Sequence, residues 1–240
     1  MTIEGKKVFV IGGGSGIGFA VAKAAVAEGA RVTIASTDFD KLNSAANRLR
    51  DAETARLDVK DESAVRAFFD SAGTIDHIVF TAGDWGGARR AAFSDLDLAS
   101  AETLFRVRFW GAVAVAKHGA KCVPPGGSIT LTGGMSAHRP QKGSAIATAM
   151  AGAVEHLTRG LAVELAPVRV NAVCPGAIHT EIWSKFPEHL REIEFARIKR
   201  QLLPRIGEPE EAAQAYLYLM RGGYTTGQTL FVEGGSALGV

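Results

Sequence analysis

Glycine residues are concentrated near the amino terminus in the segment Gly12-Gly13-Gly14-Ser15-Gly16-Ile17-Gly18. This segment follows a short apolar run and precedes a helical pattern. Glycine lets a turn approach a ligand closely, and the free N–H groups at the start of a helix face negative charge. The pattern predicts a pyrophosphate-binding turn, and a tight strand–helix turn without a ligand is the alternative. The predicted ligand-binding residues are Gly12, Gly14, Ser15, Gly16, Ile17 and Gly18.

The composition excludes several classes of protein. Hydrophobic residues make up 47% of the 240 residues and charged residues 22%, which excludes intrinsic disorder. The 27 Lys and Arg residues nearly balance the 25 Asp and Glu residues, so we expect no nucleic-acid partner. The apolar runs are far shorter than the roughly 20 residues that span a bilayer. We therefore expect no membrane segment and a cytoplasmic location.

The chain has two cysteines, Cys122 and Cys174. They are too few for a disulfide framework, and they do not have the spacing of a metal site. We therefore expect no metal ion, and we interpret both thiols as buried apolar groups.

Short apolar runs alternate with longer helical patterns along the whole chain. The spacers between the runs are long enough for crossover connections, which predicts parallel strands. We expect one α/β domain over residues 1–240, built on a doubly wound, Rossmann-type parallel sheet of about seven strands with helices on both faces. The expected strands are Lys7–Ile11, Arg31–Ala35, Ala55–Val59, Ile75–Thr81, Ser128–Thr132, Val168–Val173 and Thr229–Val232. The expected helices are Gly16–Glu28, Phe39–Arg50, Glu62–Ala72, Ala101–Lys121, Gly143–Ala166 and Pro209–Arg221.

The segment Thr180–Pro204 interrupts this alternation. Its large apolar side chains, including Trp183, Phe186 and Phe195, are interspersed with charged residues. It is expected to form either a lid helix over a pocket or an ordinary amphipathic surface helix.

The spacing Gly12-x3-Gly16-x-Gly18 resembles that of the short-chain dehydrogenase/reductase superfamily. Further segments similar to this family follow in order: Leu57-Asp58-Val59, residues 75–83, residues 169–176 and residues 226–235. The resemblance implies a nicotinamide dinucleotide cofactor. It also assigns further residues to the cofactor site, namely Asp58, Val59, Ala82, Gly83, Pro175, Gly176, Ile178 and Thr180.

The choice of cofactor depends on the residues at the end of the second strand. An acidic residue there would bond the ribose hydroxyls of NAD and repel a 2′-phosphate. This chain has Ser36-Thr37 instead, and Asp38 follows one residue late. NADP(H) is therefore favoured, and NAD(H) is possible. The preference rests on the absence of a carboxylate that would repel the 2′-phosphate and not on the presence of a cation.

The resemblance also identifies a gap at the expected active site. The family uses a Tyr-x3-Lys pair, in which the lysine lowers the pKa of the proton-donating tyrosine. The register places Ala147 at the tyrosine position and Ala151 at the lysine position. The serine position falls on Gly133 or its neighbour, and the asparagine position falls on Arg108. None of the three tyrosines of this chain has a lysine four residues later.

Four side chains near this gap are candidates for its chemistry: Ser136, His138, Lys142 and Arg108. His138 is the favoured proton donor because imidazole titrates near neutral pH, and an exposed loop histidine is the alternative. Arg108 is expected to face an anionic ligand group or to form a structural ion pair. Trp85 and the pair Arg89-Arg90 are expected in a loop over the site.

Small side chains predominate in residues 145–153. They favour packing between subunits of a homodimer or homotetramer, and extra space for a bulky ligand is the alternative. The resemblance thus implies an oxidoreductase that acts on an unknown carbonyl or alcohol substrate with a non-standard proton donor. The alternatives are a catalytically inactive NADP(H)-binding sensor or regulatory subunit, and a structural partner that binds no nucleotide.

Overall fold

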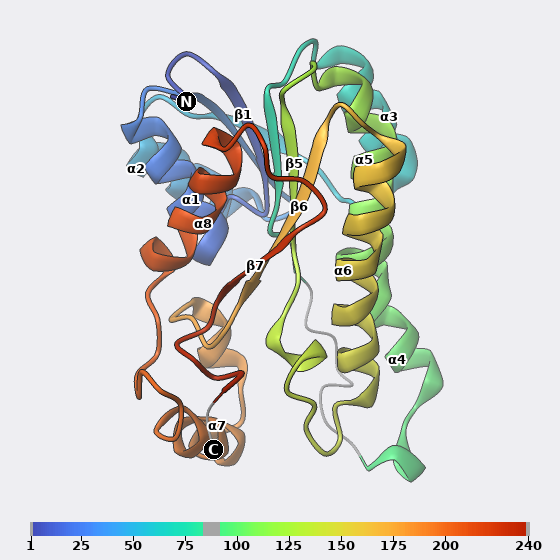
Figure 1. The fold of residues 1–240 in the computed structure, drawn as a ribbon, viewed down its shortest axis with the longest axis vertical. Helices are drawn as coiled ribbons and strands as arrows, with labels where there is room; N and C mark the ends of the chain where they lie inside the picture. Colours follow the sequence, from blue (N-terminus) through green and yellow to red (C-terminus); the bar gives the residue numbers. More distant parts are fainter. Residues whose placement is uncertain (1, 84–91, 239–240) are drawn as a thin grey trace.

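A computed structural model describes residues 2–83 and 92–238, apart from the side chain at position 185. Seven parallel strands form one sheet in the order β3-β2-β1-β4-β5-β6-β7 (Figure 1). The strands are β1 (Lys7–Ile11), β2 (Arg31–Ser36), β3 (Glu53–Arg56), β4 (His77–Phe80), β5 (Ser128–Thr132), β6 (Arg169–Pro175) and β7 (Thr229–Val232). The doubly wound α/β fold expected from the sequence is confirmed.

Helices cover both faces of the sheet, as Figure 1 shows. One face carries α1 (Gly16–Ala27), α2 (Phe39–Leu49) and α8 (Pro209–Arg221). The other carries α3 (Glu62–Ser71), α4 (Leu98–Phe105), α5 (Ala112–Gly119) and α6 (Ala145–Glu164). The remaining helix, α7 (Glu188–Ile198), lies beyond the sheet at the end of the molecule that also holds the carboxyl terminus.

Side-chain caps fix where several helices begin. The carboxylates of Asp38, Asp61 and Asp97 each accept a hydrogen bond from a backbone N–H in the first turn of α2, α3 or α4. Helix α8 begins with a reciprocal capping box between Glu208 and Glu211. These caps satisfy N–H groups that have no partner inside a helix.

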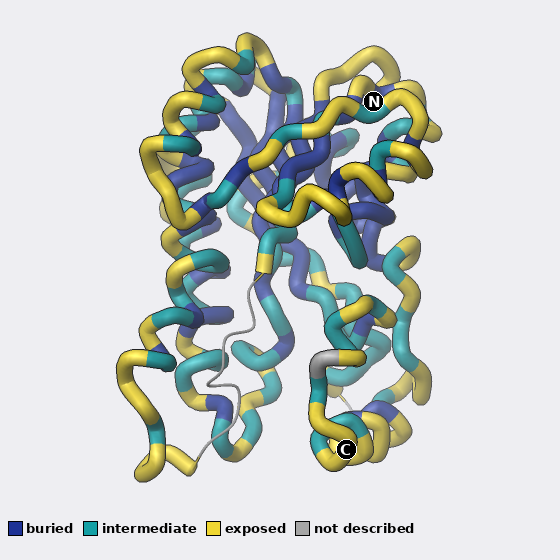
Figure 2. Tube along the Cα trace, turned by 180° about the vertical axis from the view of Figure 1, so that it is seen from behind, coloured by how far each residue is buried: buried dark blue, intermediate teal, exposed yellow. Residues whose placement is uncertain are grey.

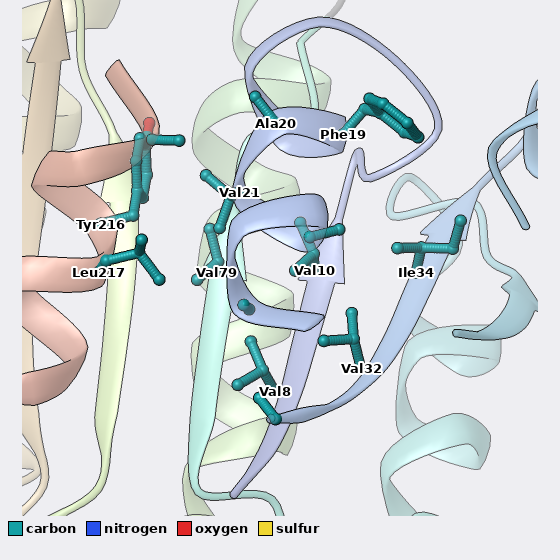
Figure 3. Close-up of a cluster of buried hydrophobic side chains, with 14 of the residues drawn as sticks. Val8, Val10, Phe19, Ala20, Val21, Val32, Ile34, Val79, Tyr216 and Leu217 are labelled. Atoms are coloured by element: carbon teal, nitrogen blue, oxygen red, sulfur yellow. The ribbon is translucent and has the colours of Figure 1, made fainter. Parts of the chain in front are cut away.

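Two apolar cores lie on opposite faces of the sheet. Figure 2 shows buried residues concentrated in the strands, with exposed residues on the outer helices and loops. Figure 3 shows the core between the sheet and helices α1 and α8, which includes Val10 and Ile34 on strands, Val21 on α1 and Leu217 on α8. The second core packs β4 and β5 against α3, α5 and α6.

The expected strands and helices agree with the structure to within three residues at each end, but one strand is shifted along the chain and one helix contains a π-helical turn. The strand expected over Ala55–Val59 lies earlier, at Glu53–Arg56. Asp58 explains the early end, because its carboxylate accepts a hydrogen bond from the Lys60 N–H and begins a turn. The helix expected over Ala101–Lys121 is helical throughout but contains a π-helical turn, η2 (Arg106–Gly111), between α4 and α5.

The segment Thr180–Pro204 forms a short 3₁₀ helix, η5 (Glu181–Lys185), followed by α7. Trp183 stacks on Phe186 and on Phe195, with ring centroids 5.5 and 5.4 Å apart. The Trp183 indole N–H donates to the carbonyl oxygen of Ile178 at 2.7 Å. This aromatic stack joins η5 to α7.

At the amino edge of the sheet, the imidazole of His77 is buried and lies 2.9 Å from the Ser128 hydroxyl. The pKa of His77 is lowered to about 4, mainly by burial and in smaller part by the nearby Arg169 guanidinium, while Asp76 opposes the change. The unfolded chain therefore takes up a proton near pH 6.5, whereas the native protein does so only near pH 4.

We expect the free energy of unfolding to fall by about 3 kcal/mol through His77 between pH 7 and pH 4, because the unfolded state binds more protons in that window. Urea unfolding at both pH values measures this difference. The variant His77→Gln should lose most of that contribution. His156→Gln, on an exposed face of α6, is the matched control and should keep the wild-type dependence. Equal pH dependence in the two variants would contradict the assignment.

Candidate functional site

The carboxyl ends of the parallel strands meet along one edge of the sheet. The order of the strands reverses between β1 and β4, and ligands of open α/β sheets bind in the crevice at such a reversal. Residues from four regions singled out in the sequence follow these strands. They are Gly12 after β1, Ser36 at the end of β2, Ala82 and Gly83 after β4, and Gly176 after β6.

The glycine turn lies against the end of β4. Gly12 has a φ of +90°, and its N–H donates to the carbonyl oxygen of Ala35 at 2.8 Å. A Cβ atom on Gly12 would lie 2.6 Å from the backbone nitrogen of Ala82. A Cβ atom on Gly18, inside α1, would lie 2.3 Å from the carbonyl oxygen of Gly12. Only glycine fits at these two positions, since real Cβ contacts are longer.

The same turn presents the start of α1 to the crevice. Ser15 is the N-cap residue and is extended, and its side chain makes no capping hydrogen bond. The first N–H groups of the helix, on Gly16 and Ile17, have no acceptor within the helix. Gly16 has a φ of +53°, and a Cβ there would lie 3.1 Å from the Thr180 methyl carbon. These unprotected N–H groups fit the pyrophosphate of a dinucleotide.

Lys41 stands beside the end of β2. A Cβ atom on Gly14 would lie 3.3 Å from Cβ of Lys41 and 3.6 Å from Cβ of Ser36. The Asp38 carboxylate accepts from the Lys41 N–H and lies 3.7 Å from its Nζ. The Ser36 hydroxyl accepts from the Asp38 N–H at 3.2 Å, and Thr37 is exposed. Asp38 is therefore engaged as a helix cap, and a cation is present where sequence analysis found none.

Asp58 and Val59 form the next side of the crevice. Asp58 pairs with Lys60 at 3.7 Å and keeps its carboxylate partly exposed. Val59 is buried against η2, because a Cβ atom on Gly111 would lie 2.7 Å from its Cγ2. The Val59 side chain thus packs against η2, while the Asp58 carboxylate is partly exposed.

The turn after β6 lies opposite the glycine turn. Gly176 donates its N–H to Val232 at 2.9 Å, and a Cβ on Gly176 would lie 2.7 Å from Cα of Glu233. Pro175 ends β6, and Ile178 is buried. A cleft of about 430 Å³ opens beside these elements. Its lining includes Gly16, Arg48, Thr180, Glu181 and Trp183.

The π-helical turn η2 places Arg108 at the edge of the sheet. A Cβ atom on Gly83 would lie 2.9 Å from Nη2 of Arg108, so the guanidinium group covers the residues after β4. The turn η2 also packs against α6. Arg108 therefore lies between the carboxyl edge and the helix that carries Ala147 and Ala151.

A chain of hydrogen bonds lies beneath this edge. The Thr132 hydroxyl donates to the carbonyl oxygen of Phe80 at 2.6 Å, so the Tyr216 hydroxyl, 2.7 Å away, donates to Thr132. Tyr216 is fully buried, and burial raises its pKa while Thr132 and the nearby Arg108 act in the opposite direction. Tyr216 therefore has a structural position below the site. Tyr218 and Tyr224 are exposed on the surface.

The four candidate side chains for acid–base chemistry have different surroundings in the structure. The Ser136 hydroxyl donates to the carbonyl oxygen of Ala147 at 3.2 Å, and Lys142 is exposed. Nε2 of His138 contacts the buried carboxylate of Glu155 at 2.8 and 3.0 Å. The role of His138 as proton donor stays a prediction. Sequence analysis missed Glu155, which appears only as one more helical residue until the fold brings it beside His138.

The predicted loop residues Trp85, Arg89 and Arg90 lie outside the described residues. The small residues Gly133, Gly134, Ala147 and Ala151, at or beside the positions that the register assigns to the family's catalytic residues, lie inside them. A Cβ atom on Gly134 would lie 4.0 Å from Cβ of the buried Ala151. The turn after β5 therefore lies against α6, and none of these four residues brings a hydroxyl, phenol or amine to that contact. Their assignment to the catalytic positions stays a prediction.

Known proteins resemble this chain over nearly its whole length. A family model described as Enoyl-(Acyl carrier protein) reductase matches residues 12–237. The short-chain dehydrogenase/reductase ATR9 of Stachybotrys chlorohalonatus (strain IBT 40285) is 33% identical, and the match covers 99% of each chain. The chain belongs to the short-chain dehydrogenase/reductase superfamily.

Solved structures of this superfamily have the same fold. The MalC Reductase/Diels-Alderase from Malbranchea aurantiaca is 34% identical with a TM-score of 0.89, and the match covers 98% of this chain and 97% of that one. A small-chain dehydrogenase in complex with NADPH is 34% identical with a TM-score of 0.82, over 98% of this chain and 100% of that one.

The superfamily is one of oxidoreductases that bind nicotinamide cofactors. Within residues 2–83 and 92–238, no helix combines the length and apolar character that crossing a membrane requires.

Gly18→Ala should destabilise the protein by about 1–3 kcal/mol, because the new methyl group would overlap the Gly12 carbonyl and the Thr81 hydroxyl. Gly160→Ala is the matched control, because it also lies within a helix and a Cβ there has open space. That control should leave stability unchanged or raise it by about 0.5–1 kcal/mol. Urea unfolding measures both changes. Equal stability of the two variants would show that the close approach at Gly18 is not needed.

Proposed function

We propose that this protein is an NADP(H)-dependent oxidoreductase that acts on a carbonyl or alcohol substrate without the family's tyrosine. The observation that carries the proposal is the close approach of the glycine turn to the end of β4, with Arg108 beside Gly83 at the same edge of the sheet. The bound nicotinamide would supply or accept a hydride. Membership of an oxidoreductase superfamily supports this assignment.

Binding of the cofactor is assigned to three groups of residues. The N–H groups at the start of α1 face the pyrophosphate, and Gly12 and Gly18 allow the close approach. Asp58, Val59, Ala82 and Gly83 line one side, and Pro175, Gly176, Ile178 and Thr180 line the other. Segment 180–204 would cover the bound cofactor as a lid.

A preference for NADP(H) is supported by the residues after β2. Lys41 is 44% exposed in its side chain and lies beside Ser36 and Gly14. A lysine ammonium group attracts a phosphate as a point charge. Ser36 and Thr37 would add hydroxyl groups. The NADPH complex of a relative is consistent with this preference.

Arg108 is proposed to contact the substrate oxygen. Arginine stays protonated and donates hydrogen bonds from a rigid planar group, so it stabilises an oxygen that gains negative charge. It does not act as an acid, and the proton must come from another group or from water. Ala147 and Ala151 have no side-chain group that could donate or accept a proton, and their small side chains leave space at this position.

The alternative function is an NADP(H)-binding sensor or regulatory subunit, and the absent tyrosine and lysine favour it. For either function we propose a homodimer or homotetramer. The exposed side chains of Trp110 and Val163 support contacts between subunits.

NADPH should bind more tightly than NADH in a calorimetric titration. Lys41→Ala should weaken NADPH binding roughly tenfold and leave NADH binding nearly unchanged, because only NADPH carries the 2′-phosphate. Lys6→Ala, at the opposite edge of the sheet, is the control and should change neither affinity. An equal loss for both cofactors would remove Lys41 as the phosphate contact. A wild type that binds neither cofactor would refute the proposed function itself.

Arg108→Ala should lower NADPH-dependent carbonyl reduction by about a hundredfold or more in kcat, because an electrostatic contact to the reacting oxygen is lost. Arg108→Lys should recover part of that activity, since it restores charge without the planar fork. The measurement is NADPH oxidation against a panel of aldehydes and ketones. A wild type that binds NADPH but reduces no carbonyl would favour the sensor. Unchanged turnover in Arg108→Ala would exclude the proposed contact.

A further inference from the structure

Three potential metal ligands from distant parts of the sequence converge next to the family's catalytic positions. They are His138 on the turn after β5, Glu155 on α6 and Cys174 on β6. Their ligand atoms all lie within 4.8 Å of one another. The separations of 17 and 19 residues along the chain match no metal-binding spacing, so only the fold reveals this group.

Within this group the closest contact joins His138 to Glu155. Nε2 of His138 lies 2.8 Å from Oε1 and 3.0 Å from Oε2 of Glu155. The Cys174 sulfur lies within 4.8 Å of the ligand atoms of both residues. A divalent cation between them would bind one donor atom from each residue and release the thiol proton.

The chemistry of the donors suits zinc or a similar cation. Zinc binds imidazole nitrogen, carboxylate oxygen and thiolate sulfur, and sites with three protein ligands leave a fourth position for water. The charges also balance, since a carboxylate, a thiolate and a neutral imidazole together neutralise a dication. A balanced set is needed here because Glu155 and Cys174 are buried, and buried charges require compensation.

The residues around the three ligands can hold them in place, and one side of the site is open to solvent. Met135 Sδ lies 3.6 Å from the Cys174 sulfur. The Phe231 ring packs edge-on against His138, with centroids 4.7 Å apart. Such outer contacts orient metal ligands. The His138 side chain is 33% exposed, so an ion can enter from that side.

We propose that His138, Glu155 and Cys174 form a binding site for a zinc-like divalent cation. The bound ion would connect the turn after β5, helix α6 and strand β6. These elements also carry Gly134 and Ala151, so the ion would hold the frame of the candidate active site. The proposal does not depend on binding of a nicotinamide cofactor.

The test is titration of the chelator-treated full-length protein with Co²⁺, without nicotinamide. One equivalent should bind and give visible absorption together with a thiolate-to-cobalt charge-transfer band. Cys174→Ser should remove the charge-transfer band. His138→Ala should weaken cobalt binding on the order of a hundredfold. Zn²⁺ should displace the cobalt and raise the Tm of the wild type.

Cys122→Ser is the matched control, because it removes the other free thiol, which lies away from this cluster. It should retain the cobalt spectrum and the zinc-dependent rise in Tm. Circular dichroism establishes that each variant is folded, and Glu155→Gln provides an independent variant if Cys174→Ser is unstable. The proposal is overturned if Co²⁺ gives no thiolate band, if that band depends on Cys122, or if His138→Ala binds cobalt as the wild type does.

Discussion

The close approach of β1, the glycine turn and the end of β4 is the contact on which the rest of the site depends. The Gly18 backbone lies against the Gly12 carbonyl, and Gly12 lies against the backbone at Ala82. The Thr81 hydroxyl donates to the Ile11 carbonyl at 3.1 Å and completes this contact. Because Gly12 and Gly18 place no side chain of their own between these segments, helix α1 starts directly at the point where the strand order reverses. The carboxyl ends of the other strands then surround the crevice, whose position this contact determines.

The fold could be predicted from the sequence because its signals are local and repeated. Continuous apolar runs, glycines after strands and acidic helix caps each indicate one element, and together they specify the alternation of strands and helices. The strand β3 was the weakest signal, since only four residues pair and most of them are exposed. The π-helical turn had no signal, because the apolar pattern of the long helix continues through it.

The candidate site could be predicted only where the conformation of the backbone forms it, as in the glycine turn. Gly12, Gly16 and Gly18 could be identified because the backbone conformation and the spacing of these glycines form the turn. Lys41 and Glu155 could not, because Lys41 meets the glycine turn and Glu155 meets His138 only once the helices that carry them are packed. The same holds for His138 and Cys174, which meet only after β5, α6 and β6 are assembled. Side-chain convergence of this kind is a property of the packed fold, and no spacing in the chain encodes it.

The π-helical turn η2 has a geometric consequence for the two helices that it joins. It holds one residue more than the α-helical form needs, and each residue turns a helix by about 100°. Ala101 and Leu104 of α4 and Val115 of α5 are all buried with this turn in place, and Arg108 lies within it. Deletion of one residue from η2 would therefore rotate α5 against α4 by about 100°. Either the buried residues of α4 or those of α5 would then leave the apolar core.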